Sequence, residues 1–311
     1  MNKKVVVLGG GTGLSTLLRG LKQFPLDITA IVSVCDDGKS TGILRKEFNI
    51  PAVGDLRRVI VSLSETEPLI EELFNYRFST SSDLNNHTVG NLLLTALANI
   101  TGNISDGVES LSKVLNLKGQ VLPLTEDNVI LMGKMEDGTV IEGEHNITLD
   151  TRKIKDVFYK EEPIVTPKAI EAINNADLII LSMGSIFTSI IPNLICKEMI
   201  DAIDASKAKI MYVCNMTTQP GETDGFKVSD HVNLLNRYLG KKKIDIVIAN
   251  SGKIDPEIAE KYSNLEQKDP VILDEENVSA EIIKSNFVDL SENVIRHNVI
   301  KLSSYIFTSL L

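Results

Sequence analysis

Short apolar runs of strand length alternate with longer segments of helical periodicity along most of this 311-residue chain. The strand-length runs lie at residues 5–8, 28–34, 177–181, 210–214 and 244–249. Helical spacing of apolar residues follows at 14–21, 55–63, 69–78, 89–98 and 108–115, and again after Ser291. Parallel strands need long crossover connections, which are usually helices. We therefore expect a Rossmann-like, doubly wound α/β fold, with one mostly parallel sheet and helices on both of its faces.

The alternating pattern is interrupted between about residues 121 and 160. Two strand-like runs at 129–132 and 139–142 flank the dipeptide Asp137-Gly138, which suits the tight turn of a hairpin. The alternation of strands and helices resumes after Tyr159. We therefore expect a single domain over residues 1–311 that carries a small β-rich insertion at about 121–160.

Charge and composition exclude several classes of function. The net charge of −10 argues against a protein that binds a nucleic-acid polymer or an anionic membrane surface. The absence of Trp disfavours a stacking platform for single-stranded nucleic acid. No run approaches the ~18 apolar residues of a membrane span, and we read no signal peptide. The three cysteines lack metal-site spacing and fit a reducing compartment, so we expect a cytoplasmic protein.

The segment from Gly9 to Gly13 contains four glycines between the first predicted strand and the following helix. Glycines let the backbone approach a ligand closely, and the free N–H groups at a helix N-terminus attract anions. The spacing matches neither the dinucleotide fingerprint nor the P-loop, which disfavours an NAD-dependent enzyme. We predict a phosphate or nucleotide contact here. The alternative is a tight turn that joins strand to helix.

Acidic residues follow the second predicted strand and begin a later helix. Asp36 and Asp37 lie near the position of the ribose-binding acid in dinucleotide folds, and adjacent carboxylates also bind Mg²⁺ beside phosphates. A polar turn explains the same pair equally well. Asp55 fits a helix N-cap. Arg57 and Arg58 would oppose the helix dipole in the first turn, which suggests either a nearby anion or exposure to solvent.

Two polar loops, at 182–189 and 215–223, follow later predicted strands. Polar loops at the carboxyl edge of a sheet are typical of recognition surfaces, although simple hydrophilic connections have the same composition. His87 precedes an apolar helix, so it either points into the cleft or flanks the helix cap. The four histidines lack metal-site spacing, and no nucleophile elbow of a serine hydrolase is present.

Taken together, these motifs resemble one family, the YvcK group of gluconeogenesis factors in the CofD-like superfamily. The motifs that carry the resemblance are Gly9–Ser15, Asp36-Asp-Gly, Gly54–Arg57, His87–Asn91, Thr188–Asn193, Asn215-Met216, Thr218–Thr223 and Asp230-His231. The resemblance implies a CofD-like fold and a cytoplasmic bacterial protein that supports cell shape and growth on gluconeogenic carbon sources. It also implies binding of UDP-sugars such as UDP-N-acetylglucosamine, and protein partners in cell-wall metabolism. A homodimer is compatible with a fold of this size.

The resemblance carries over a set of ligand-binding positions: Gly10, Gly11, Thr12, Gly13, Leu14, Asp36, Asp37, Ser40, His87, Asn91, Gly184, Ser185, Thr188, Asn215, Thr218, Gln219 and Thr223. More distant CofD relatives are Mg²⁺-dependent transferases, so the alternative function is a transferase that acts on a phosphodiester or diphosphate. Its metal ligands would be Asp36, Asp37 and Asp55, and its catalytic candidates Asp37, Asp55 and Arg57. Lys39, Thr41 and Ser182-Met183 depart from the usual pattern of the family.

Overall fold

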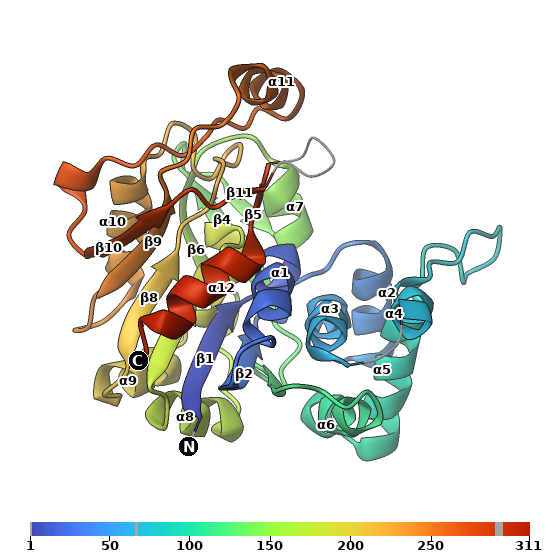
Figure 1. Ribbon diagram of the computed structural model, residues 1–311. Coiled ribbons are helices and arrows are strands. Elements are labelled where there is room, and N and C mark those ends of the chain that lie inside the picture. Colours follow the sequence, from blue (N-terminus) through green and yellow to red (C-terminus); the bar gives the residue numbers. More distant parts are fainter. Residues whose placement is uncertain (1, 66–67, 290–294) are drawn as a thin grey trace.

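A seven-stranded parallel sheet forms the centre of the computed structural model, which describes residues 2–65, 68–289 and 295–311 (Figure 1). Every pair of neighbouring strands in this sheet is parallel. In spatial order the strands are β3 (Gln120–Pro123), β2 (Leu26–Val32), β1 (Lys3–Gly9), β7 (Leu178–Leu181), β8 (Lys209–Val213), β9 (Ile246–Asn250) and β10 (Glu281–Ser285). The predicted doubly wound architecture is confirmed. The strand order reverses between β1 and β7, which is where ligands bind in open parallel sheets.

Helices cover the two faces of the sheet, and a further group of helices lies beside its β2–β3 edge. Figure 1 shows α1 and α12 in front of the sheet and α8 to α10 behind it, with α3 to α6 gathered as a lobe on one side. Their bounds are α1 (Gly11–Leu21), α3 (Val53–Leu63), α4 (Pro68–Asn75), α5 (Val89–Thr101), α6 (Ile104–Val114), α8 (Pro167–Asn174), α9 (Lys197–Ala205), α10 (Val228–Tyr238), α11 (Pro256–Glu266) and α12 (Val299–Thr308). None of the helices in the described ranges combines the length and the apolar character needed to cross a bilayer.

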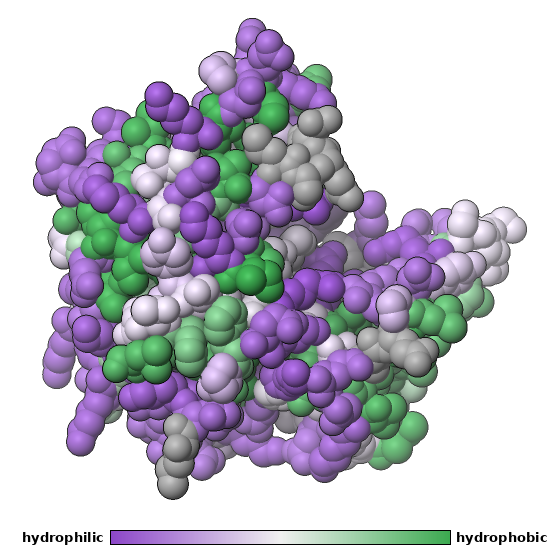
Figure 2. Space-filling model, viewed as in Figure 1, coloured by the Kyte–Doolittle hydropathy of each residue, from purple (hydrophilic) through white to green (hydrophobic). Residues whose placement is uncertain are grey.

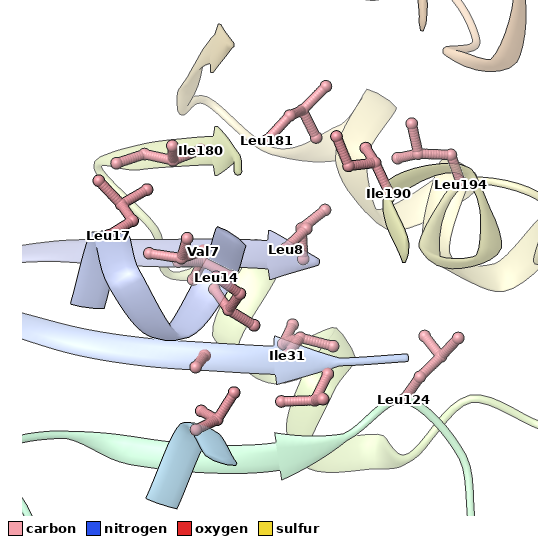
Figure 3. Packing of buried hydrophobic residues seen from close by; sticks show 14 of the residues in the cluster. Val7, Leu8, Leu14, Leu17, Ile31, Leu124, Ile180, Leu181, Ile190 and Leu194 are labelled. Carbon is pink, nitrogen blue, oxygen red and sulfur yellow. The ribbon is translucent and has the colours of Figure 1, made fainter. Parts of the chain in front are cut away.

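The core lies between the sheet and α1. Residues 5–8 of β1 are almost entirely buried, as expected for a central parallel strand. In α1, Leu14, Leu17, Leu18 and Leu21 have the i, i+3, i+4, i+7 spacing of one helix face, and all four are buried. Figure 3 shows Leu14 and Leu17 packed beside strand residues of the core. This packing fixes the helix against β1, so the first turn of α1 points to the carboxyl edge of the sheet.

The insertion forms a separate antiparallel sheet. Its strands are β4 (Leu131–Met135), β5 (Val140–Glu142) and β6 (Ile154–Tyr159), and α7 (Glu144–Leu149) connects β5 to β6. The predicted Asp137-Gly138 hairpin is present, and Gly138 has the positive φ of 87° that the turn requires. The predicted range of 121–160 begins too early, however, because β3 pairs with β2 in the main sheet.

Three segments differ from the sequence-based expectation. Residues after Asp37 form α2 (Lys39–Phe48), which is held by tertiary contacts: Arg45 donates to the carbonyl of Cys35 at 3.0 Å. The loop after β7 continues as a π-helical turn at Ile186–Ile190 and a 3₁₀ turn at Ile191–Asn193, and not as a regular helix. Pro192 lacks the N–H that a regular helix needs. The edge strand β10 was not predicted, because it is only partly buried and lacks a continuous apolar run.

Candidate functional site

A cleft of about 470 Å³ lies at the carboxyl edge of the main sheet, at the point where the strand order reverses. The loops after β1, β2, β7 and β8 form its walls, and α3, α7 and β12 (Arg296–His297) complete them. Its size is typical of a site for a small molecule. The cleft is lined by twelve of the residues predicted from the sequence: Gly10, Gly11, Thr12, Gly13, Asp36, Asp55, Gly184, Ser185, Thr188, Asn215, Thr218 and Gln219. The carboxyl ends of four predicted strands therefore do meet.

The glycine-rich loop packs too closely on its neighbours to carry side chains. A Cβ on Gly10 would lie 2.6 Å from the Ser33 hydroxyl oxygen, and one on Gly13 would lie 2.3 Å from the carbonyl oxygen of Met183. Gly11 has a φ of +62°, which favours glycine. The first turn of α1 has no acidic residue of its own, and Gly10, which precedes it, has no side chain to cap it. The Asp55 carboxylate accepts the backbone N–H of Gly11, so the N–H groups that follow in this turn are the ones available to an anion in the cleft.

Three carboxyl groups, those of Asp36, Asp55 and Glu144, also line the cleft. Burial, and next the Asp36 carboxylate, raises the pKa of Asp55 to about 6, although Arg58 donates to Asp55 Oδ1 at 3.1 Å. Burial, and next the charges of Asp36 and Asp55, raises the pKa of Glu144 to about 7. This crowding of acidic groups concentrates negative charge that a proton or a cation would relieve.

The predicted Mg²⁺ set of Asp36, Asp37 and Asp55 does not converge. Within the described ranges, no group of three His, Cys, Asp or Glu side chains is arranged to hold a metal ion. Asp37 turns away from the cleft, and its Oδ1 accepts the backbone N–H of His145 at 2.8 Å, in the first turn of α7. Asp36 and Asp55 alone fit the usual Mg²⁺ arrangement, in which one or two carboxylates share the ion with phosphates of a ligand.

A second compartment of about 270 Å³ adjoins the cleft and shares Asp36 and Arg58 with it. The predicted residues Ser40, Arg57 and Asn91 line this compartment and not the main cleft. His87 lies behind it, and its Nδ1 is 2.9 Å from the Ser40 hydroxyl. These predicted residues therefore belong to a neighbouring region, which the loop between β2 and α2 connects to the cleft.

Two more predicted positions line neither space. Leu14 is fully buried in the core. Thr223 is also buried, and its hydroxyl accepts the backbone N–H of Gln219 at 2.9 Å, which stabilises the loop after β8. Neither side chain lines the cleft, so both residues support the site only through their packing and hydrogen bonding.

Glu222 joins the two polar loops of the cleft, and we did not predict this role. Its carboxylate accepts the Ser185 hydroxyl at 2.7 Å and the backbone N–H of Phe187 at 3.2 Å, and Gln219 Nε2 donates to it at 2.5 Å. Burial raises the pKa of Glu222 to about 7. Asn215 completes the link, because its Nδ2 donates to the carbonyl of Gly184 at 2.9 Å.

Glu144 could not be predicted as a site residue, because its position depends on how the insertion folds back over the sheet. Glu144 is the first residue of α7, and the preceding Gly143 has a φ of +95°. No neighbouring motif marks it as a site residue. For Glu222, the signal was its place in the polar run after a strand.

Comparisons with known proteins agree with this arrangement. The family model described as 2-phospho-L-lactate transferase CofD matches residues 5–289. The chain is 46% identical to the gluconeogenesis factor of Halalkalibacterium halodurans, with 98% of this chain and 95% of that protein covered. It is also 46% identical to the gluconeogenesis factor of Bacillus subtilis, with 97% and 96% covered. A crystal structure of a Bacillus halodurans protein, 45% identical, superimposes with a TM-score of 0.95 over 98% of this chain and 99% of the other.

Proposed function

Because this chain belongs to the CofD family, we propose that its cleft binds a nucleotide sugar of the UDP-N-acetylglucosamine type. In this proposal the protein is a cytoplasmic gluconeogenesis factor, and its loaded state acts on protein partners in cell-wall metabolism to maintain cell shape during gluconeogenic growth. The similarity to gluconeogenesis factors over nearly the whole chain supports this role. The observation that carries the ligand is the first turn of α1, whose residues Gly11, Thr12 and Gly13 line the cleft.

The cleft offers different chemistry to the different parts of such a ligand. The N–H groups at the start of α1 suit the diphosphate, since they provide donors and the positive end of the helix dipole. The loops around Ser185 and Asn215 offer hydroxyl and amide groups, which suit the sugar and the base. Glu222 holds these two loops together, so the polar groups are fixed before the ligand arrives.

A Mg²⁺-dependent transferase is the second candidate, and the position of Asp36 and Asp55 near the start of α1 favours it. Transfer of a phosphoryl-linked group relies on positioning and charge stabilisation and needs no covalent residue. The two candidates differ in their response to Asp55→Asn. For a transferase, this change abolishes turnover and leaves nucleotide binding measurable, whereas a regulator shows no turnover in the wild type either.

Thr12 provides a direct test of the proposed diphosphate position. It is exposed in the first turn of α1 and lines the cleft. A glutamate there suits the helix dipole but adds to the acidic groups of the cleft, so Thr12→Glu should fold with a stability close to that of the wild type. Its carboxylate would repel a diphosphate, and we expect the affinity for UDP-N-acetylglucosamine to fall by roughly tenfold or more. Calorimetric titration measures this change.

The matched control is Thr12→Gln, which has nearly the same size without the charge. We expect this variant to bind the nucleotide sugar within about threefold of the wild type. Equal loss of affinity in both variants would indicate a steric effect. Normal affinity in a folded Thr12→Glu protein would contradict the placement of the diphosphate at α1.

A further inference from the structure

The second compartment, of about 270 Å³, is lined mainly by basic side chains. Lys39, Arg57, Arg58 and Arg77 line it, together with His145. Among the described residues that line it, Asp36 is the only carboxylate. This local excess of positive charge contrasts with the net charge of −10 of the whole chain. A local group of cations in an acidic protein indicates a site for an anion.

Three of these cations have no carboxylate partner in the described ranges. Arg58 is paired with Asp55 at 3.1 Å, but Arg57 donates to the side-chain oxygen of Asn75, and Arg77 donates to a backbone carbonyl. Lys39 is exposed at the rim and makes no side-chain hydrogen bond or ion pair with these residues. The charge of the compartment therefore remains largely uncompensated by the protein itself.

Arg57 distinguishes the compartment from an ordinary cluster of exposed charges, because its side chain is buried. Its side chain is only 5% exposed, and its Nε has no hydrogen-bond partner among the described atoms. Burial, and next the charges of Arg58 and Arg77, lowers the pKa of Arg57 to about 10. The charges of Asp55 and Asp36 favour the guanidinium, but their effects are smaller than those of burial and of the two arginines. Burying a guanidinium that is only partly compensated is costly, because the lost hydration is not fully replaced. A bound anion would supply both the charge and the missing acceptor.

Gly90 makes room for this arginine. A Cβ at position 90 would lie 2.7 Å from Arg57 Cδ and 2.8 Å from Cγ, so glycine lets the side chain lie across α5. A larger residue would push the guanidinium out of the compartment. The local sequence of α5 is therefore consistent with a guanidinium that is held in one position.

We propose that this compartment binds the phosphate group of a second phosphorylated small molecule, while the nucleotide sugar occupies the main cleft. The inference rests on the proposed function only for the identity of the molecule in the cleft. Guanidinium and ammonium groups together bind a phosphate dianion through charge-assisted hydrogen bonds. The compartment is smaller than the cleft, so it suits a phosphate group better than a nucleotide. Asp36, which lines both spaces, would lie between the two ligands.

The test is a titration of inorganic phosphate into the protein saturated with UDP-N-acetylglucosamine, followed by calorimetry and ³¹P NMR. We expect one phosphate to bind per chain without displacing the nucleotide sugar, and to bind more weakly as salt is added. Lys39→Gly and Arg77→Gln should each weaken phosphate binding by roughly tenfold. Lys39 has a φ of +39°, which glycine adopts easily, so Lys39→Gly should fold.

Lys46→Gln is the matched control, because Lys46 is exposed on the same helix but lies outside the compartment. It should bind phosphate as the wild type does. Phosphate that displaces the nucleotide sugar, or that binds equally well to the Lys39 and Arg77 variants, would overturn the proposal. If the nucleotide sugar itself fails to bind, the same phosphate titration is run without it, so that the phosphate compartment is tested separately from the nucleotide-sugar site. Phosphate binding that depends on Lys39 and Arg77 would then support the compartment as a phosphate site, while the failed titration of the nucleotide sugar would reject the proposed ligand of the cleft.

Discussion

At the scale of single residues, the cleft holds carboxyl groups in an environment that disfavours their charge. Asp55 and Glu144 are both affected by burial first and by neighbouring carboxylates second. The polar loops, the start of α1 and the basic compartment surround these acids with donors. This arrangement costs stability at neutral pH, and such costs are common where a site is built for a ligand.

The pH dependence of stability should reveal this cost at Asp55. Its pKa rises from 3.8 to about 6, so between these values the folded protein retains a proton that the unfolded chain has lost. The contribution of Asp55 to the free energy of unfolding therefore falls as the pH rises through this window. We expect Asp55→Asn to gain stability relative to the wild type from about pH 4 to pH 7, by up to about 3 kcal/mol.

Urea unfolding of the two proteins across this range measures the effect. Comparing variant with wild type cancels the contributions of groups remote from Asp55, such as the buried His231, whose pKa is lowered to about 4 by burial. Glu144 is not remote, because the charge of Asp55 raises its pKa, so its contribution to the difference is included. Asp27→Asn, at an exposed position of β2, is the control, and its free energy of unfolding should change with pH as that of the wild type does. A difference between Asp55→Asn and the wild type that does not change with pH would contradict the shifted pKa.

Placement in the cleft could be predicted best for residues that adjoin a predicted strand end. Gly10, Gly13 and Asp36 met this condition, and all three line the cleft. Asp37 met it as well, yet its carboxylate accepts the His145 N–H at the start of α7, a contact that depends on how the insertion folds. Glu144 did not meet it, since only the folding of the insertion brings this residue to the sheet edge.

At the scale of elements, the short helix α7 depends on contacts from outside the insertion. It has six residues, which is too short for a helix to be stable alone. Asp37 caps its start by accepting the His145 N–H, and a Cβ on Gly143 would lie 2.4 Å from Asp37 Oδ2. The loop after β2 therefore positions the helix that carries Glu144 into the cleft.

Removing this anchor should loosen α7 without unfolding the protein. Asp37→Ala deletes the acceptor of a partly buried hydrogen bond, so we expect backbone amides in 144–149 to exchange with solvent roughly tenfold faster. Asp37→Asn keeps a side-chain oxygen at the same place and should stay close to the wild type. Hydrogen exchange followed by mass spectrometry measures both. Equal protection of α7 in Asp37→Ala and the wild type would show that Asp37 does not hold the helix.

The elements that could be predicted are those with a clear local pattern, either apolar periodicity or turn residues such as Asp137-Gly138. β1 and α1 have continuous and periodic apolar residues, respectively, and both were expected. α2 is held by Arg45, whose partners include Asn128, more than 80 residues away along the chain. Local periodicity carries no information about such a contact, which explains why this helix was missed.

At the scale of the whole molecule, the reversal of strand order between β1 and β7 explains where the cleft lies. The helical lobe and the β insertion then close it from two sides. In the view of Figure 2, the surface is hollowed between the body that contains the sheet and this lobe, and mostly hydrophilic residues border the hollow. The alternation of strands and helices predicts this edge, but the walls contributed by α3 and α7 depend on tertiary folding.

The proposal that this cleft binds an intact nucleotide sugar can be tested by calorimetric titration of the wild-type protein with UDP-N-acetylglucosamine. The titration is run with EDTA and again with Mg²⁺, and the ligand is recovered and analysed afterwards. We predict saturable binding of one molecule per chain under both conditions, with the ligand recovered unchanged. Binding that requires Mg²⁺, together with conversion of the ligand, would favour the transferase. The absence of binding under both conditions would contradict the proposed nucleotide-sugar site.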